Sequence, residues 1–176
     1  PHIAERGGGS VVLMSSLSAL RGNGAINAIL ATPEARQFRI FLTSREDAKL
    51  GRHLTSLALD WGHEVTLYNR GHRQHPDWRE LTQLQGDRDQ SLAPLLGEGL
   101  HWDLAIDTCC YDPAQAASLS TALLGRCERL IFISTISVYR DFARPEMDES
   151  APLHEVAPGE SASGYGPLKV LCEAEY

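Results

Sequence analysis

The sequence predicts an α/β domain in which parallel strands alternate with helices that cover both faces of one sheet. From Phe38 onward, short apolar runs alternate with segments whose apolar residues recur at helical spacing. The run 130–134 is continuously apolar, as expected for a strand buried on both faces. The length of 176 residues favours one such domain with a small addition. The predicted class is therefore a doubly wound parallel sheet.

The expected elements follow one another in a regular order. Strands are predicted at 38–43, 63–69, 81–85, 104–108 and 130–134, and helices at 50–61, 90–96, 113–124 and from 165 onward. Gly62 is placed to end the first helix, and Pro113 to occupy the first turn of a later one. The segment 140–163, rich in Pro, Ser and acidic residues, predicts a long loop.

The first 37 residues are predicted to form an N-terminal strand-helix appendage to a domain spanning 38–176. A strand is expected at 10–16 and a helix at 25–35. Residues 12–18 match 131–137 type for type, which leaves both a duplicated piece and a chance recurrence open. The chain lacks an initiator Met and ends inside its last predicted helix. We therefore expect a C-terminally truncated piece of a longer protein, and the sequence leaves open whether the chain is a fragment or a fusion.

Composition excludes several classes of protein. Hydrophobic residues at 43% and charged residues at 22% are unlike a disordered chain. The net charge of −7 disfavours a nucleic-acid partner, and no apolar run reaches the ~20 residues of a membrane-spanning helix. Four cysteines without disulfide or zinc spacing predict reduced thiols in a cytoplasmic protein. His72 and His75 lie among Gly, Arg and Pro, which predicts a solvated loop rather than a metal site.

The most specific group of candidate catalytic residues is Thr135, Tyr165 and Lys169. Thr135 follows an apolar strand, and Tyr165 and Lys169 are four residues apart on a predicted helix, so they share a face. The ammonium favours ionisation of the phenol, which makes Tyr165 usable as an acid or base. Reactive groups are expected at this edge because ligands of open α/β sheets bind at the carboxyl ends of the strands.

These residues resemble the short-chain dehydrogenase/reductase superfamily, specifically its extended branch of NAD-dependent epimerases and dehydratases. The resemblance covers 38–176 and is strongest at 51–54, 62–71, 102–108 and 134–139, together with Tyr165 and Lys169. It implies a Rossmann-like fold and an oxidoreductase or epimerase acting on a secondary alcohol or a nucleotide-sugar-like small molecule. By this resemblance Thr135 orients the substrate and Tyr165 transfers a proton. Lys169 tunes Tyr165 and holds the nicotinamide ribose.

The resemblance also implies a nicotinamide cofactor. It assigns cofactor contacts to Thr43, Gly51, Asn69, Arg70, Asp87 and Thr108. NAD sites of this architecture end the second strand with a carboxylate that accepts from the ribose 2′-OH. Here the strand ends Asn69-Arg70, and a guanidinium suits a 2′-phosphate, which favours NADP over NAD. Asp87 corresponds to the position that approaches the adenine.

One departure from the family concerns the phosphate-binding turn. Relatives have three glycines between the first strand and its helix, whereas only Gly51 remains here, and Glu46 and Asp47 occupy the phosphate position. We therefore expect weak cofactor binding. A second hypothesis stays open: a non-catalytic scaffold of the same fold that binds protein or RNA, although the acidic charge opposes RNA. The sequence does not determine the oligomeric state.

Overall fold

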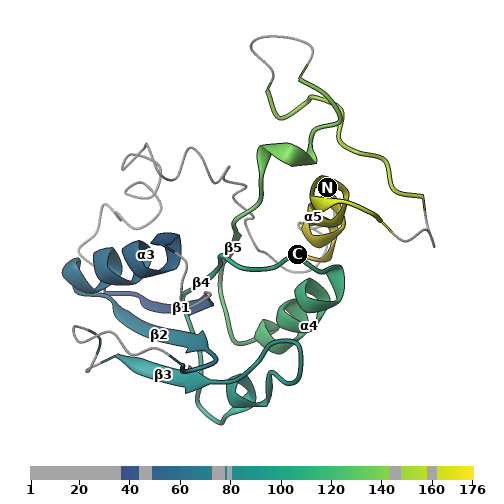
Figure 1. Cartoon of the computed structure of the whole chain (residues 1–176). Helices are drawn as coiled ribbons and strands as arrows, with labels where there is room; N and C mark the ends of the chain where they lie inside the picture. Colours follow the sequence, from purple (N-terminus) through teal and green to yellow (C-terminus); the bar gives the residue numbers. More distant parts are fainter. Residues whose placement is uncertain (1–36, 44–48, 73–77, 79–80, 143–147, 158–161) are drawn as a thin grey trace.

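Five parallel strands form one sheet, in the order β3-β2-β1-β4-β5 (Figure 1). The computed structural model describes residues 37–43, 49–72, 78, 81–142, 148–157 and 162–176. The strands are β1 (Arg39–Thr43), β2 (Glu64–Asn69), β3 (Thr82–Gln85), β4 (Leu104–Asp107) and β5 (Leu130–Phe132). The central strand is β1; β2 and β3 extend the sheet to one edge, and β4 and β5 extend it to the other. This is the predicted Rossmann-like doubly wound topology, and the fold class is confirmed.

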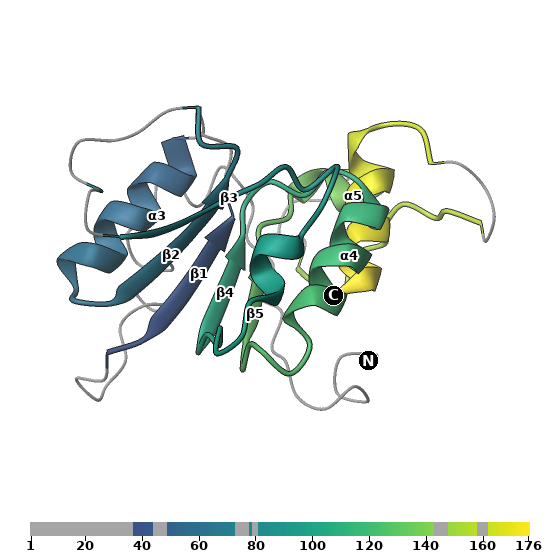
Figure 2. The same ribbon diagram turned by 90° about the horizontal axis from the view of Figure 1, so that it is seen from below.

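Helices cover both faces of the sheet (Figure 2). Helix α3 (Lys49–Asp60) lies on one face, and α4 (Pro113–Leu123) and α5 (Tyr165–Glu175) lie on the other. In the part of the chain that the structure describes, two single-turn 3₁₀ helices, η3 (Ala93–Leu96) and η4 (Ile136–Val138), lie in the connections. A parallel sheet needs this double cover because both faces of its strands are apolar.

The alternation of side chains along the strands divides the core into two layers. The layer under α3 is aliphatic and contains Ile40, Leu42, Leu54, Ala58, Val65, Leu67, Leu104, Ile106, Ile131 and Ile133. The layer under α4 and η3 is rich in aromatic rings and contains Phe41, Tyr68, Leu95, Trp102, Ala105, Leu119, Ala122 and Leu123. A smaller cluster continues it beneath α5, with Cys110, Ala116, Phe132 and Cys172.

Both predicted helix boundaries are confirmed. Gly62 has φ +78°, and its N–H bonds to the carbonyl of Leu59, so it ends α3 in the left-handed conformation. Asp112 precedes α4 and accepts from the N–H of Ala114 at 2.7 Å, while Pro113 occupies the first turn. An acidic cap and an N-terminal Pro together define where α4 begins.

The helix predicted at 90–96 is wrong in type and length, because only the 3₁₀ turn η3 forms there. The carbonyl of Asp87 accepts from the N–H groups of Gln90 and Ser91, which closes a turn before any helix begins. Ser91 Oγ then accepts from the N–H of Ala93 at 3.1 Å. Pro94 lacks an N–H and Gly97 follows immediately, so an α-helix has no room to propagate.

The chain after β5 is more ordered than a plain loop. The strand ends at Phe132 rather than at residue 134, because the carbonyl of Ile133 accepts from Lys169 Nζ at 2.8 Å instead of continuing a ladder. Within the predicted loop 140–163, Leu153 forms an antiparallel bridge with Tyr139.

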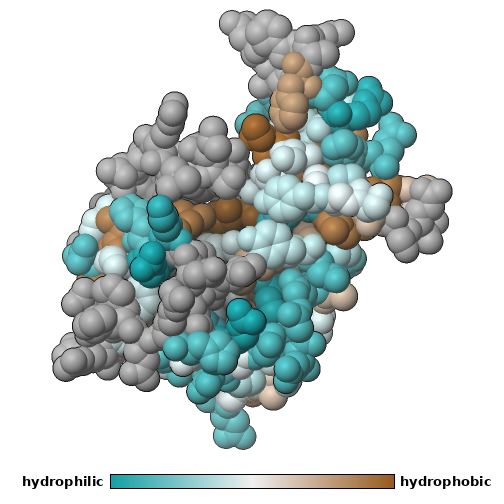
Figure 3. Space-filling view, viewed as in Figure 1, coloured by the Kyte–Doolittle hydropathy of each residue, from teal (hydrophilic) through white to brown (hydrophobic). Residues whose placement is uncertain are grey.

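Hydrophobic surface is visible between α3 and α5 on the face of the molecule shown in Figure 3.

Several predictions fall on residues outside the described ranges. These are the N-terminal strand at 10–16, the helix at 25–35, the acidic pair Glu46 and Asp47, and His75. The domain boundary between residues 37 and 38 stays a prediction, because residues 1–36 lie outside the described ranges. Among the described residues, no helix combines the length and apolar character needed to cross a membrane.

Candidate functional site

The carboxyl ends of the strands meet along one edge of the sheet. Thr43, the last residue of β1, lies in register with Tyr68 of β2 and with Asp107 of β4. Asn69, at the end of β2, pairs with Gln85 at the end of β3. The order of the strands reverses between β1 and β4, and open α/β sheets form their ligand crevice at such a point.

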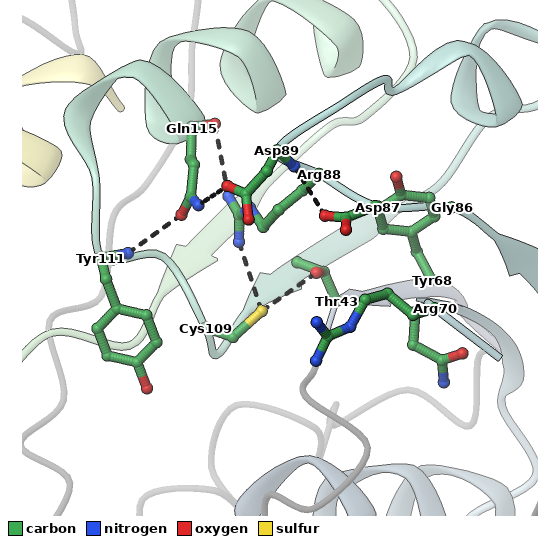
Figure 4. Close-up of a pocket in the computed structure, with 11 residues that line it drawn as sticks. Thr43, Tyr68, Arg70, Gly86, Asp87, Arg88, Asp89, Cys109, Tyr111 and Gln115 are labelled. Carbon is green, nitrogen blue, oxygen red and sulfur yellow. Dashed lines mark hydrogen bonds between the residues drawn. The ribbon is translucent and has the colours of Figure 1, made fainter. Parts of the chain in front are cut away.

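A cavity of about 190 Å³ lies at this edge (Figure 4). Its walls come from the ends of β1, β2 and β3, from the connection between β4 and α4, and from the first turn of α4. They comprise Thr43, Tyr68, Asn69, Arg70, Gly86, Asp87, Arg88, Asp89, Cys109, Tyr111 and Gln115. The cavity therefore combines four acidic or basic residues that follow β2 and β3 with two tyrosines and a thiol.

Four of the six residues assigned to a cofactor line this cavity: Thr43, Asn69, Arg70 and Asp87. The other two do not line it. Thr108 donates its hydroxyl to the carbonyl of Thr43 at 2.9 Å, and Gly51 is buried in the first turn of α3, where its carbonyl accepts from Thr55. The structure thus gathers four predicted residues at one cavity, places Thr108 next to Thr43, and leaves Gly51 with a contact inside α3.

The end of β2 is held in a tight turn by Asn69. Its Oδ1 accepts from the N–H of Gly71 at 2.8 Å and from Gln83 Nε2 at 2.9 Å. Gln85 Nε2 bonds to the carbonyl of Arg70, which fixes the same turn from β3. The amide oxygen of Asn69 is thus engaged within the protein, and the exposed guanidinium of Arg70 is the charged group at the end of this strand.

A buried ion pair lies behind the cavity wall. Arg88 and Asp107 form two parallel hydrogen bonds of 3.0 and 2.9 Å, and the Asp107 side chain is fully buried. The N–H of Cys109 and the hydroxyl of Tyr176 also donate to this carboxylate. Burial opposes the charge of Arg88, but Asp107 outweighs it and raises the pKa of the guanidinium. The pair joins β3, β4 and α5 through charge-assisted hydrogen bonds.

Cys109 lies between this ion pair and Thr43. Its sulfur is 3.4 Å from both Thr43 Oγ1 and Arg88 NH1. Burial, reinforced by the Asp107 carboxylate, raises the pKa of the thiol to about 11. The thiol therefore stays neutral at physiological pH and is no nucleophile there.

Lys169 is buried on α5 beneath the site. Its Nζ donates to the carbonyl of Ile133 and lies 4.3 Å from the ring centroid of Phe132, 5.1 Å from that of Tyr111, and 6.0 Å from that of Tyr165. Burial lowers the pKa of the ammonium, and Asp107 partly offsets this effect. Aromatic faces and one carbonyl thus surround the cation.

Tyr165 and Thr135 lie near the same end of β5. Tyr165 is 47% exposed, and its ring centroid is 6.2 Å from that of Tyr111. Thr135 precedes η4, and its Oγ1 bonds with the hydroxyl and N–H of Ser137. A Cβ on Gly166 would lie 2.0 Å from the carbonyl oxygen of Ser137, so the start of α5 contacts η4 as closely as glycine permits.

Sequence reasoning missed Arg88, Cys109, Tyr111 and Gln115, which line the cavity. A usable signal was present for Arg88. It follows Asp87 directly after β3, and Asp107 places an acid at the end of an otherwise apolar strand, so opposite charges occur at two neighbouring strand ends. For Tyr111 the signal in the sequence was weaker, because it consisted only of an aromatic residue shortly after β4.

The structure resembles several solved enzymes. WbmG of Bordetella bronchiseptica in complex with NAD matches with a TM-score of 0.61 and 18% identity over 82% of this chain and 51% of that one. UDP-glucose 4-epimerase of Brucella ovis in complex with NAD gives 0.57 and 20% over 77% and 46%. A short-chain dehydrogenase/reductase of Veillonella parvula gives 0.52 and 18% over 58% and 50%.

The chain has the fold of the short-chain dehydrogenases. The resemblance found in the sequence is thereby confirmed at the level of fold, and the matching structures include a putative NAD-dependent epimerase/dehydratase. The chain spans about half the length of the structures it matches. No family model and no curated protein matches the sequence.

Proposed function

We propose that the chain forms the cofactor-binding part of an NADP-dependent oxidoreductase or epimerase that acts on a secondary alcohol or a nucleotide-sugar-like substrate. The observation that carries this proposal is the cavity at the strand ends, where Thr43, Asn69, Arg70 and Asp87 converge. The structural neighbours of the chain include enzymes solved with NAD and with NADP. Bound NADP would supply or accept a hydride at the substrate carbon.

The cavity fits the adenosine end of such a cofactor. A volume of about 190 Å³ is below the ~300 Å³ at which whole-ligand pockets begin, so it accommodates part of a dinucleotide. Asp87 can accept a hydrogen bond there, and the exposed guanidinium of Arg70 can pair with a phosphate.

The turn at Asn69 supports NADP over NAD. A 2′-OH of ribose needs an acceptor, but the Asn69 oxygen already accepts two hydrogen bonds from Gly71 and Gln83. A 2′-phosphate instead needs donors, which Arg70 and the Asn69 amide group can provide.

In the proposed reaction, Tyr165 transfers a proton to or from the substrate oxygen and Thr135 orients that oxygen. The exposed Tyr165 can reach a substrate, whereas Lys169 is buried and acts through its charge. Tyr111 closes the cavity on the side of Tyr165, since its ring contacts Tyr165 and also lines the cavity. The cofactor site and the proton-transfer site are therefore adjacent.

Calorimetric titration of the chain with NADPH and NADH tests the proposal. We expect weak binding that favours NADPH, because Glu46 and Asp47 repel the pyrophosphate. Arg70→Ala should weaken NADPH binding by roughly tenfold and leave NADH nearly unchanged. Arg129→Ala is the matched control, since Arg129 is exposed at the beginning of β5, on the opposite edge of the sheet. An equal loss of affinity for NADPH and NADH would contradict the assignment of Arg70 to the 2′-phosphate.

A loop replacement separates weak binding from no binding. Exchanging residues 44–49 for a glycine-rich turn of family length should raise cofactor affinity at least tenfold, on the order of 1.4 kcal/mol. If neither the natural chain nor the glycine-rich variant binds NADPH or NADH, the proposal of a cofactor domain fails. The rival function, a non-catalytic scaffold of the same fold, would then stand. Sequestration of Lys169 among aromatic rings and Ile133 is compatible with that rival.

A further inference from the structure

Two cysteines from distant parts of the sequence meet beneath α5. Cys110 belongs to the connection between β4 and α4, and Cys172 lies in α5. Their sulfur atoms are 3.7 Å apart, both side chains are fully buried, and both thiols are free. We propose that Cys110 and Cys172 are an oxidation site that closes to a disulfide and ties α5 to the β4–α4 connection.

The geometry needs only a small change. A disulfide holds its sulfur atoms about 2.0 Å apart, so the pair must approach by less than about 2 Å. Ala116 and Phe132 belong to the same buried cluster as the two cysteines. Rotation of the two side chains with a slight shift of α5 can supply this movement.

The four cysteines differ in their surroundings, and the differences favour this pair. Cys109 bonds with Thr43 and Arg88, and Cys127 Sγ bonds to the carbonyl of Arg129 at 3.0 Å. Burial raises the pKa of each of these two thiols to about 11. In contrast, the hydrogen bond with Cys172 lowers the pKa of Cys110 despite its burial. Cys110 Sγ also donates to the carbonyl of Asp112 at 3.3 Å, so the feature that sets Cys110 apart is the partner sulfur beside it.

Hydrogen peroxide is a sufficient oxidant for the step. The Cys110 thiolate attacks one peroxide oxygen, the O–O bond breaks, and the released hydroxide takes a proton to become water. The Cys172 sulfur then attacks the Cys110 sulfur, the S–O bond breaks, and a second water leaves. Two thiols and one peroxide thus give one disulfide and two waters, with two electrons passing from sulfur to oxygen.

The disulfide would join one wall of the cavity, the β4–α4 connection, to α5. Cys110 lies between Cys109 and Tyr111, which line the cavity, and Cys172 follows Lys169 by three residues on α5. Closing the bond also closes a loop of the chain between residues 110 and 172, which restricts the unfolded state. Oxidation should therefore stabilise the fold, independently of any cofactor.

Peptide mapping of the whole chain after peroxide treatment tests the proposal. The oxidised chain is alkylated without reduction and digested with trypsin, which releases residues 89–126 and 170–176 as separate peptides. We expect these two peptides to be joined, free thiols to fall from four to two, and the melting temperature to rise by on the order of 10 °C.

Three variants make the assignment specific. Cys110→Ser should abolish the joined peptides and the rise in melting temperature. Cys109→Ser and Cys127→Ser should each retain both effects. Cys109 is the sharper control, because it lies on the same tryptic peptide as Cys110. The proposal is overturned if Cys110 and Cys172 remain reduced after Cys127 has been oxidised, or if they reach sulfinic acid without cross-linking. The peptide mapping is done on the natural chain, so its result does not depend on whether a variant folds.

Discussion

The two faces of the sheet are stabilised in different ways. The face under α3 packs aliphatic side chains against one another. The face under α4 and α5 has aromatic rings, and next to them are a buried ammonium, a buried ion pair and two adjacent thiols. Both faces come from the same strands, whose residues alternate between them.

The alternation is clearest in β4. Leu104 and Ile106 point to the aliphatic layer, whereas Ala105 packs in the aromatic layer and Asp107 binds Arg88. One face therefore stabilises the domain mainly through burial of apolar area. The other face holds charged groups close to the cavity, which make that face vulnerable to loss of a single partner.

The largest expected effect is loss of the buried carboxylate. Asp107→Ala should lower the free energy of unfolding by about 3–5 kcal/mol, because it leaves the Arg88 guanidinium buried without its partner. Urea denaturation followed by circular dichroism measures this loss. Replacing both partners, with Arg88→Met and Asp107→Leu, should recover most of it, since no unpaired charge then remains. A single-variant loss below about 1 kcal/mol would contradict the importance of the pair.

The thiol of Cys109 should make stability depend on alkaline pH. Its folded pKa, about 11, is above the ordinary thiol value of 9.0, so the unfolded thiol ionises first as the pH rises. Stability from this group is complete below pH 9.0 and is lost as the pH approaches about 11. Relative to Cys109→Ala, the natural chain should lose roughly 1–2 kcal/mol between about pH 8 and about pH 10. Equal pH slopes for the two chains would count against a buried neutral thiol.

The matched change on the aliphatic face should be smaller and independent of pH. Ile106→Val, next to Asp107 in β4, removes one buried methylene and should cost about 0.5–1.5 kcal/mol. Denaturant titration at neutral and mildly alkaline pH should give the same difference from the natural chain. A pH-dependent difference would mean that the two faces are energetically coupled.

The smallest expected effect comes from removing the buried ammonium. Lys169→Met loses the hydrogen bond to Ile133 but also relieves burial of a charge, so the free energy of unfolding should change by less than about 1 kcal/mol. The same denaturation measurement applies. A loss above about 2 kcal/mol would show that Lys169 is a structural residue rather than one retained for chemistry.

The aliphatic face was largely predictable from the sequence. The apolar runs containing Ile40, Leu67 and Ile131 gave the strands, and helical spacing gave α3, because hydrophobic periodicity records which side is buried. The glycine and proline at the ends of α3 and α4 set their boundaries by local backbone chemistry alone.

The other face was predictable only in part. Thr43, Asn69, Arg70 and Asp87 could be located because strand ends converge in this topology. The pairing of Arg88 with Asp107, and the enclosure of Lys169 by Phe132, depend on contacts between residues far apart in the sequence, which periodicity does not record. The expected helix at 90–96 failed because two turn-forming carbonyl contacts at Asp87 preceded it.

Two glycines at this edge differ in what evolution could put in their place. A Cβ on Gly86 would lie 2.6 Å from the hydroxyl oxygen of Tyr68, so homologues with a larger residue at 86 should carry a smaller one at 68, and the positions should covary. A Cβ on Gly166 would meet the main-chain oxygen of Ser137, which every amino acid possesses. No substitution elsewhere removes that obstacle. Across related sequences, position 166 should therefore be glycine whatever the other residues are, whereas position 86 should vary together with position 68.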